Sequence, residues 1–245
     1  MTPVDVNVFT GGAPYREVPH PEPAVLARVL AREGVGAAWV ADLPSAFGAD
    51  PHARSELLFE SLAPHADVLR PVITVDPARA GWEDALARGA TRGAVAVRGY
   101  ARGDALRALA ARSGAAGMPL LLAAHLEPAA EAHFAGAGAA TVRDALGASA
   151  EVRVVVTGAA RALIEETEAA VEPAMRARLW WEISRIAGPP ADDLAVLVRA
   201  MGASRFVYGS GWPLRLTQVP RANLELLPSD LAGSALAAAP FIARP

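Results

Sequence analysis

The feature that most constrains the fold of this chain is a regular alternation of short apolar runs with segments of helical spacing. Eight runs rich in Val, Leu and Ile recur along the 245 residues. Each run is apolar almost without a break, which is typical of parallel strands buried on both faces. The predicted strands are Val4–Phe9, Ala37–Leu43, Leu69–Asp76, Ala94–Tyr100, Pro119–Leu126, Val152–Gly158, Leu179–Ser184 and Phe206–Gly211.

Segments with helical spacing lie between these runs. Several have a proline near the first turn and a glycine just beyond the last, as Gly34, Gly117 and Gly202 illustrate, and this asymmetry is usual for helices. The stretch Glu127–Gly138 is compatible with either a helix or a loop. The predicted helices are Pro23–Glu33, Pro51–Pro64, Gly81–Arg88, Gly103–Gly117, Ala139–Gly147, Arg161–Val171, Pro189–Met201 and a closing stretch from Val219.

Regular alternation of strand and helix predicts a parallel sheet. Eight units in a chain of this length favour a single (β/α)₈ TIM barrel, with residues 1–245 as one domain. An open, doubly wound sheet is the alternative. It is disfavoured because no Gly-x-Gly-x-x-Gly follows the first strand, where Thr10-Gly11-Gly12 leads into Ala13 and Pro14 instead.

Composition excludes several classes of function. The formal net charge is −3, which gives no basic surface for nucleic acid. The cationic residues are all Arg, so neither a lysine Schiff base nor a Walker-type phosphate loop is available. The sequence has no Cys, which excludes disulfides and a thiol nucleophile. No apolar run approaches the roughly 20 residues of a membrane span, so we expect a cytoplasmic protein without membrane contact.

In a barrel of this kind the functional site lies at the carboxyl ends of the strands. Residues two apart on a strand share a face, so Asp5 lies with Asn7 and Phe9. Asp42 and Asp76 precede prolines and are expected to cap the turns or helices that follow. The candidates are Asp5, Asn7, Phe9, Asp42, Asp76, Arg98, Tyr100, His125, Glu127, Thr157, Glu182, Ser184, Arg185, Ser210, Trp212 and Arg215.

Two candidates stand out by their context. Arg98 interrupts an apolar strand, and a guanidinium inside a barrel needs an anionic partner. That partner is either a carboxylate of the chain (Asp5, Asp76 or Glu182) or an anionic group of a ligand. His125 ends the most apolar strand, which makes it either a hydrogen-bonded residue of the barrel rim or a general acid/base.

The two ends of the chain resemble those of one known family, the amidohydrolase-related barrels. The start Val4-Asp5-Val6-Asn7-Val8-Phe9, followed by Gly11 and Pro14-Tyr15-Arg16, is similar to the family's opening strand. The end Arg205-Phe206-Val207-Tyr208-Gly209-Ser210-Gly211-Trp212-Pro213 is similar to its closing Gly-Ser-Asp-Trp-Pro signature. Generic segments between them follow in the expected order, so the resemblance covers nearly the whole chain.

The resemblance implies metal ligands that this sequence largely lacks. Family members carry His-x-His at the end of strand 1, histidines after strands 5 and 6, and an aspartate after strand 8. Here these positions hold Asn7 and Phe9, either Ala123 or His125, Thr157, and Gly211. Zinc and similar ions need three or four imidazole or carboxylate donors. The family's ordinary metal-dependent hydrolysis is therefore not expected to transfer to this chain.

Three functions are compatible with the sequence. The first is a metal-free enzyme of hydrolase or lyase type that binds or converts a small anionic metabolite, with no cofactor. The second is a catalytically inactive binding or regulatory subunit, either a homo-oligomer or paired with a metal-bearing relative through Trp212-Pro213-Leu214 and Pro240-Phe241-Ile242. The third is a metallohydrolase with atypical ligands. For the first, the catalytic candidates are His125, Asp5 and Tyr100, and the substrate-binding candidates are Asn7, Arg16, Arg98, Trp212 and Arg215.

Overall fold

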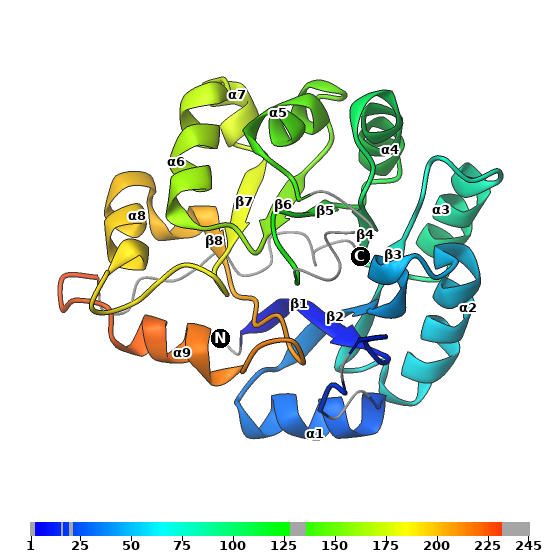
Figure 1. Cartoon of the computed structure of the whole chain (residues 1–245), viewed down its shortest axis with the longest axis horizontal. Helices are drawn as coiled ribbons and strands as arrows, with labels where there is room; N and C mark the ends of the chain where they lie inside the picture. The colour runs from blue at the N-terminus through cyan, green and yellow to red at the C-terminus, as the bar shows by residue number, and fades with distance from the viewer. Residues whose placement is uncertain (1–2, 16, 20–21, 128–135, 232–245) are drawn as a thin grey trace.

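The strands form one sheet that surrounds the centre of the molecule (Figure 1). The computed structural model describes residues 3–15, 17–19, 22–127 and 136–231. Neighbouring strands are parallel and follow in sequence order. They are β1 (Val4–Thr10), β2 (Ala37–Asp42), β3 (Leu69–Thr74), β4 (Ala96–Gly99), β5 (Leu120–Ala123), β6 (Val154–Thr157), β7 (Leu179–Glu182) and β8 (Phe206–Val207).

The sheet closes where the last strand meets the first. Val6 N donates to Tyr208 O at 3.0 Å, and Gly211 N donates to Asn7 O at 2.8 Å. Phe9 N donates to the main-chain oxygen of Trp212 at 2.8 Å. These bonds join β1 to the segment that continues β8, so the predicted (β/α)₈ barrel is confirmed and the open doubly wound sheet is wrong.

The helices follow one another around the outside of the barrel (Figure 1). Short 3₁₀ turns η1 (Pro44–Phe47), η2 (Ala63–His65) and η4 (Ala203–Arg205) complete several connections. The α-helices are α1 (Pro23–Arg32), α2 (Pro51–Leu62), α3 (Trp82–Thr91), α4 (Gly103–Ala115), α5 (Ala139–Gly147), α6 (Arg161–Ala170), α7 (Pro173–Arg176), α8 (Asp193–Met201) and α9 (Gln218–Glu225).

The predicted elements exist, but some of their bounds differ. The helix predicted from Pro189 begins at Asp193, because Asp192 has a φ of 53° and left-handed backbone cannot continue an α-helix. Gly81 has a φ of 74° and therefore precedes α3 instead of starting it. The short helix α7 was not predicted. Most of the ambiguous stretch Glu127–Gly138 lies outside the described residues.

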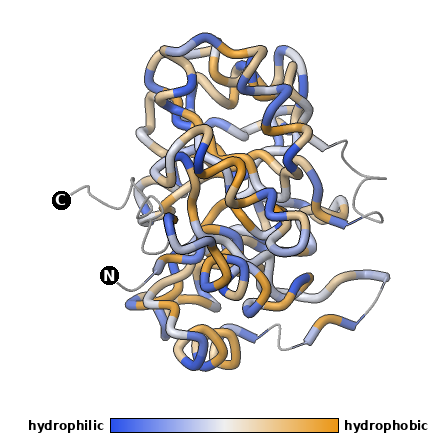
Figure 2. The backbone as a smooth tube through the Cα atoms, turned by 90° about the vertical axis from the view of Figure 1, so that its left-hand side faces the viewer, coloured by the Kyte–Doolittle hydropathy of each residue, from blue (hydrophilic) through white to orange (hydrophobic). Residues whose placement is uncertain are grey.

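Alternation along each strand divides the apolar residues into two groups. Ile73 and Val97 belong to the cluster that also contains buried helix residues such as Leu106, so they face the helices. Val72 and Ala96 belong to a second cluster inside the barrel. Hydrophobic stretches accordingly run through the middle of the molecule (Figure 2). No helix among the described residues is long and apolar enough to cross a membrane.

Candidate functional site: a buried polar cluster around Arg98

Polar side chains fill inward positions near the carboxyl ends of several strands. Because Ala96 faces the interior and Val97 faces the helices, Arg98 on β4 faces the interior again. Its side chain is only 1% exposed. We call the buried residues around it the Arg98 cluster: Asp5, Asn7, Phe9, Arg98, Thr157, Glu182, Ser184 and Ser210.

The Arg98 guanidinium contacts residues from two other strands. Nη2 donates to Asn7 Oδ1 at 2.9 Å, and Nη1 lies 3.4 Å from Thr157 Oγ1. The guanidinium carbon also lies 4.8 Å from the centroid of the Phe9 ring, within cation–π range. Nε is buried and has no hydrogen-bond partner. Arg98 therefore contacts three of the positions at which the resemblance implies metal ligands.

None of Asp5, Asp76 and Glu182 forms a salt bridge with Arg98, which was one of the two arrangements expected for it. None of the ion pairs among the described residues includes Arg98. Asp76 pairs instead with Arg79, whose Nε lies 3.4 Å from Asp76 Oδ2. The Asn7 side chain separates Arg98 from Glu182, because its amide donates to Glu182 Oε2 at 3.1 Å while its oxygen accepts from Arg98. Burial lowers the pKa of Arg98, and the nearby charges of Tyr100 and Glu182 oppose this effect.

Glu182 is held by donors from three elements. Oε2 accepts from Asn7 Nδ2 at 3.1 Å, from Gly158 N at 3.1 Å and from Ser184 Oγ at 2.9 Å. The Ser184 main-chain N–H donates to Oε1. Burial raises the pKa of Glu182, and these hydrogen bonds act in the opposite direction. Gly209 leaves room for this carboxylate, since a Cβ there would lie 2.3 Å from Glu182 Cγ.

Asp5, two residues before Asn7 on β1, is fully buried. Its Oδ1 accepts from Asn7 N at 3.1 Å and from Ser210 N at 3.0 Å, while Oδ2 is buried without a partner. Burial raises the pKa of Asp5 to about 7, against the lowering effect of the hydrogen bonds from Ser210 and Asn7. Near neutral pH this carboxyl group therefore exists in both protonation states.

Ala123 and His125, the two residues that could match the strand 5 ligand position, differ in their surroundings. Ala123, the last residue of β5, is buried and pairs with Thr157, while His125 lies two residues beyond it and is partly exposed. Gly211 has a φ of 72°, and a Cβ on it would lie 3.2 Å from Arg215 Cδ. The Arg215 side chain thus lies next to the position where the resemblance implies an aspartate.

The remaining candidates lie in several environments. Trp212 is 7% exposed and packs in the apolar cluster between strands and helices, and Pro213 is also buried, so neither presents the surface that an interface would need. Arg215 is partly buried, which lowers its pKa. Arg16 and the segment Pro240–Ile242 lie outside the described residues.

The two aspartates expected to cap turns do so. Asp42 Oδ2 accepts from Ser45 N at 3.0 Å and Asp76 Oδ1 accepts from Ala78 N at 3.0 Å. Asp42 also pairs with Arg54 at 2.6 Å.

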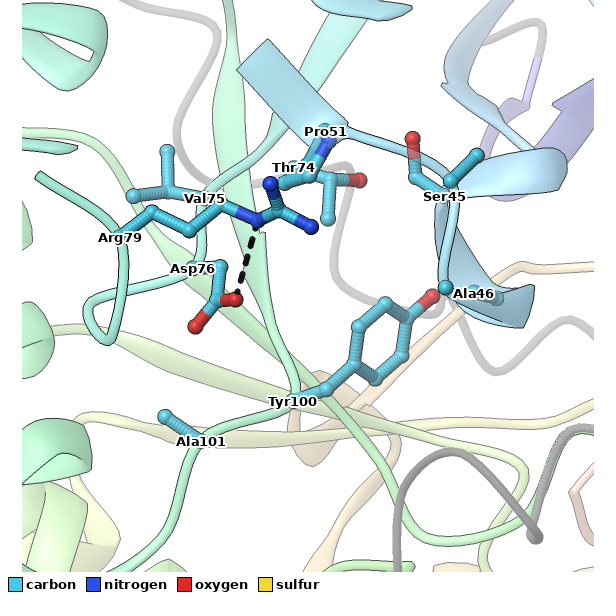
Figure 3. Close-up of a pocket in the computed structure, with 11 residues that line it drawn as sticks. Ser45, Ala46, Pro51, Thr74, Val75, Asp76, Arg79, Tyr100 and Ala101 are labelled. Carbon is cyan, nitrogen blue, oxygen red and sulfur yellow. Dashed lines mark ion pairs between the residues drawn. The ribbon is translucent and has the colours of Figure 1, made fainter.

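Sequence reasoning missed a cavity beside the Arg98 cluster. This cavity, of about 170 Å³, lies at the carboxyl ends of β3 and β4 and against the connection from β2 to α2 (Figure 3). Thr74, Arg79 and Tyr100 are among the residues that line it. Tyr100 and Asp76, which also lines the cavity, were sequence candidates, whereas Thr74 and Arg79 were not, since a threonine within a strand and an arginine in a loop carry no distinctive pattern.

The described residues contain no group of three or more His, Asp or Glu side chains arranged to hold a metal ion. No family model matches the sequence. A comparison with curated proteins also finds no match. The matches found by comparison with known proteins are therefore to solved structures.

Three solved structures illustrate that resemblance. A putative amidohydrolase from Staphylococcus aureus has a TM-score of 0.69 at 10% identity, over 100% of both chains. 2,6-Dihydroxybenzoate decarboxylase from Rhizobium has a TM-score of 0.67 at 11% identity, over 98% of both chains. A probable 2-pyrone-4,6-dicarboxylic acid hydrolase from Acinetobacter baumannii, with citric acid bound, has a TM-score of 0.64 at 11% identity, over 92% of this chain and 91% of that one.

Fold and neighbours together define the class of this protein as a (β/α)₈ barrel. Within that class, its architecture is similar to that of a putative amidohydrolase and of a decarboxylase. Identities this low establish the fold alone, so the chemistry has to be argued from the site.

Proposed function

We propose that this chain binds a small anionic metabolite at the carboxyl ends of its strands and converts it, in a hydrolase- or lyase-type reaction, without a metal ion. The observation that carries the proposal is the buried guanidinium of Arg98, which belongs to none of the ion pairs among the described residues. A guanidinium stays protonated in proteins, and a buried charge needs a counter-charge. A carboxylate or phosphate group of a ligand supplies one, and Arg98 Nε is a donor still available to it.

The residues at the expected metal positions do not suit a divalent ion. Asn7 and Thr157 offer neutral oxygens that already face Arg98 nitrogens at 2.9 and 3.4 Å. Phe9 has no donor atom in its side chain. The strand 5 position is either Ala123, which also has none, or His125, whose single imidazole is fewer donors than the three or four that such an ion needs. A divalent ion among these groups would also be repelled by the guanidinium at short range in a medium of low dielectric constant. The proposed reaction therefore contains no metal-dependent step.

Proton transfer in the proposed reaction falls to Asp5. Its pKa of about 7 lies near physiological pH, where a group both accepts and donates protons efficiently. Its Oδ2 is buried without a hydrogen-bond partner. Tyr100 and Asn7 are proposed to polarise or orient a ligand oxygen, and His125 stays a predicted second proton carrier. Arg16, Trp212 and Arg215 stay predicted ligand contacts.

The structural neighbours support a carboxylate as the ligand. The Acinetobacter protein has citric acid bound, and the 2,6-dihydroxybenzoate decarboxylase has been solved with 2,6-dihydroxybenzoate. Both compounds are small organic acids. We therefore take citrate, succinate and inorganic phosphate as the first probes for this chain.

Ligand-induced stabilisation tests the proposal. A ligand at 100 times its Kd raises the free energy of unfolding by about 2.7 kcal/mol, so binding is visible as a higher melting temperature. We expect at least one probe to stabilise the wild type and the variant Arg28→Met, which loses an exposed arginine of α1. Arg98→Met should not respond, and Arg98→Lys should respond weakly. Equal responses of Arg98→Met and the wild type would refute the role of Arg98.

Two further measurements separate the alternatives. Elemental analysis of the purified protein should find no stoichiometric metal, and one equivalent of zinc or manganese per chain would contradict the metal-free site. If a probe binds through Arg98 but no acid tested is turned over, the chain is a binding subunit and the catalytic part of the proposal is wrong.

A further inference from the structure

The cavity beside the Arg98 cluster contains a hydroxyl group without a partner. Thr74, on the inward face of β3, is 5% exposed, and its Oγ1 has no hydrogen-bond partner. Ser45, on the opposite wall, differs because its hydroxyl donates to Asp42 Oδ2 at 2.8 Å. Buried polar groups in proteins are nearly always paired, so an unpaired one facing a cavity points to a ligand atom or to water.

Arg79 lies at the mouth of the same cavity. Its guanidinium extends from the β3–α3 connection toward Thr74 (Figure 3). It is 3.4 Å from Asp76 Oδ2 and 3.8 Å from Asp50 Oδ2, which are long ion pairs. Both carboxylates also accept backbone N–H groups, from Ala78 and His52 respectively. Arg79 can therefore turn to an acidic group of a ligand without leaving either aspartate unpaired.

The cavity adjoins the Arg98 cluster through two residues. Thr74 and Arg98 are directly paired in the β3–β4 register, and neighbouring strands are about 4.8 Å apart. Tyr100, two residues after Arg98, lines the cavity; burial raises the pKa of its phenol, and the nearby charge of Arg98 opposes this effect. A ligand in the cavity thus has a neutral hydroxyl on its wall and guanidinium groups at its mouth and behind that wall.

We propose that this cavity recognises a hydroxyl group of the anionic ligand, with Thr74 as the residue that selects a hydroxy acid over the same acid without its hydroxyl. This inference rests on the anion binding proposed above. A cavity of about 170 Å³ has room for about six water-sized groups at about 30 Å³ each, which accommodates the hydroxyl-bearing end of a four-carbon acid. Thr74 contributes to specificity and takes no part in bond making or breaking.

Matched pairs of acids test the selection of a hydroxyl. Malate and succinate differ by one hydroxyl group, as do citrate and tricarballylate, so the ratio of their Kd values isolates its contribution. Isothermal titration calorimetry would be run on the wild type, on Thr74→Val and on Thr167→Val. Thr167 is the matched control because it is buried in α6, away from the cavity, and its Oγ1 also lacks a partner.

We expect the wild type and Thr167→Val to bind the hydroxy acid about fivefold more tightly, as one neutral hydrogen bond provides. In Thr74→Val this ratio should fall to about one, with the Kd of succinate and tricarballylate unchanged. Equal Kd values for both members of each pair in the wild type would overturn this inference alone. A preference that survives Thr74→Val would also overturn it. If no acid binds the wild type at all, the proposed function fails together with it.

Discussion

Replacing Asp5 by asparagine should change how the stability of this protein depends on pH. In the folded chain burial holds the pKa of Asp5 at about 7, whereas 3.8 is its ordinary value. Between these values the folded state keeps a proton that the unfolded chain has already lost. The contribution of Asp5 to the free energy of unfolding therefore falls as pH rises from about 4 to about 7 and is constant above that.

The difference between the ordinary pKa of 3.8 and the pKa of about 7 in the folded chain corresponds to about 4 kcal/mol of unfolding free energy, at 1.36 kcal/mol per pKa unit. Asp5→Asn removes the ionisation while keeping an oxygen that can accept from Asn7 N and Ser210 N. We therefore expect the free energy of unfolding of the variant, minus that of the wild type, to rise by about 4 kcal/mol between pH 4 and pH 8. At pH 8 the variant should be at least as stable as the wild type.

Urea denaturation at intervals of half a pH unit measures this difference, and subtracting the two curves cancels every other titrating group. Asp67→Asn is the control, because Asp67 is exposed and its replacement relieves no buried charge. A difference between wild type and Asp5→Asn that stays constant from pH 4 to pH 8 would show that Asp5 is ionised throughout. The proton-transfer role proposed for Asp5 would then be wrong.

Two further predictions concern packing and hydrogen bonding. Gly209→Ala should lower the free energy of unfolding by about 1–3 kcal/mol, because a Cβ there lies 2.3 Å from Glu182 Cγ. Gly12→Ala, where a Cβ meets no atom within 4 Å, should change it little, and equal urea midpoints for the two variants would contradict this reasoning. Glu168→Ala should lower the free energy of unfolding by about 2 kcal/mol in the same assay, because it removes the acceptor of Trp181 Nε1 at 2.8 Å and the partner of Arg205 at 2.7 Å. A loss below about 0.5 kcal/mol would mean that water replaces these bonds at little cost.

The elements of the fold were predictable from the sequence because their signals are local. An unbroken apolar run marks a strand buried on both faces wherever it occurs, and eight such runs in order leave few arrangements other than a barrel. Helix ends were less predictable where backbone conformation decides. Asp192 adopts left-handed backbone and shortens α8. Aspartate tolerates this conformation better than most residues, but only a minority of aspartates adopt it, so the residue type does not predict it.

Strand alternation correctly predicted that Arg98 faces the interior. On β1 the same rule fails, because the register shifts between Asp5 and Val8, so that Val6 and Phe9 pack inside the barrel while Val8 faces the helices. The sequence does not show which groups pair with the Arg98 guanidinium. That depends on contacts across the barrel between residues far apart in the chain, 91 positions in the case of Asn7 and Arg98. Only the closed sheet brings the Asn7 amide between Arg98 and Glu182, where one alternative from the sequence was a direct salt bridge.

The cavity was decided by tertiary structure alone. Thr74, Arg79 and Tyr100 lie at or beyond the ends of two strands, and their separation in space depends on how β3 and β4 are staggered. Hydrophobic periodicity determines that a residue faces inward. Whether it then meets apolar side chains, a guanidinium or open space depends on the register of the closed barrel and on the rotamers of its neighbours, which no local pattern encodes.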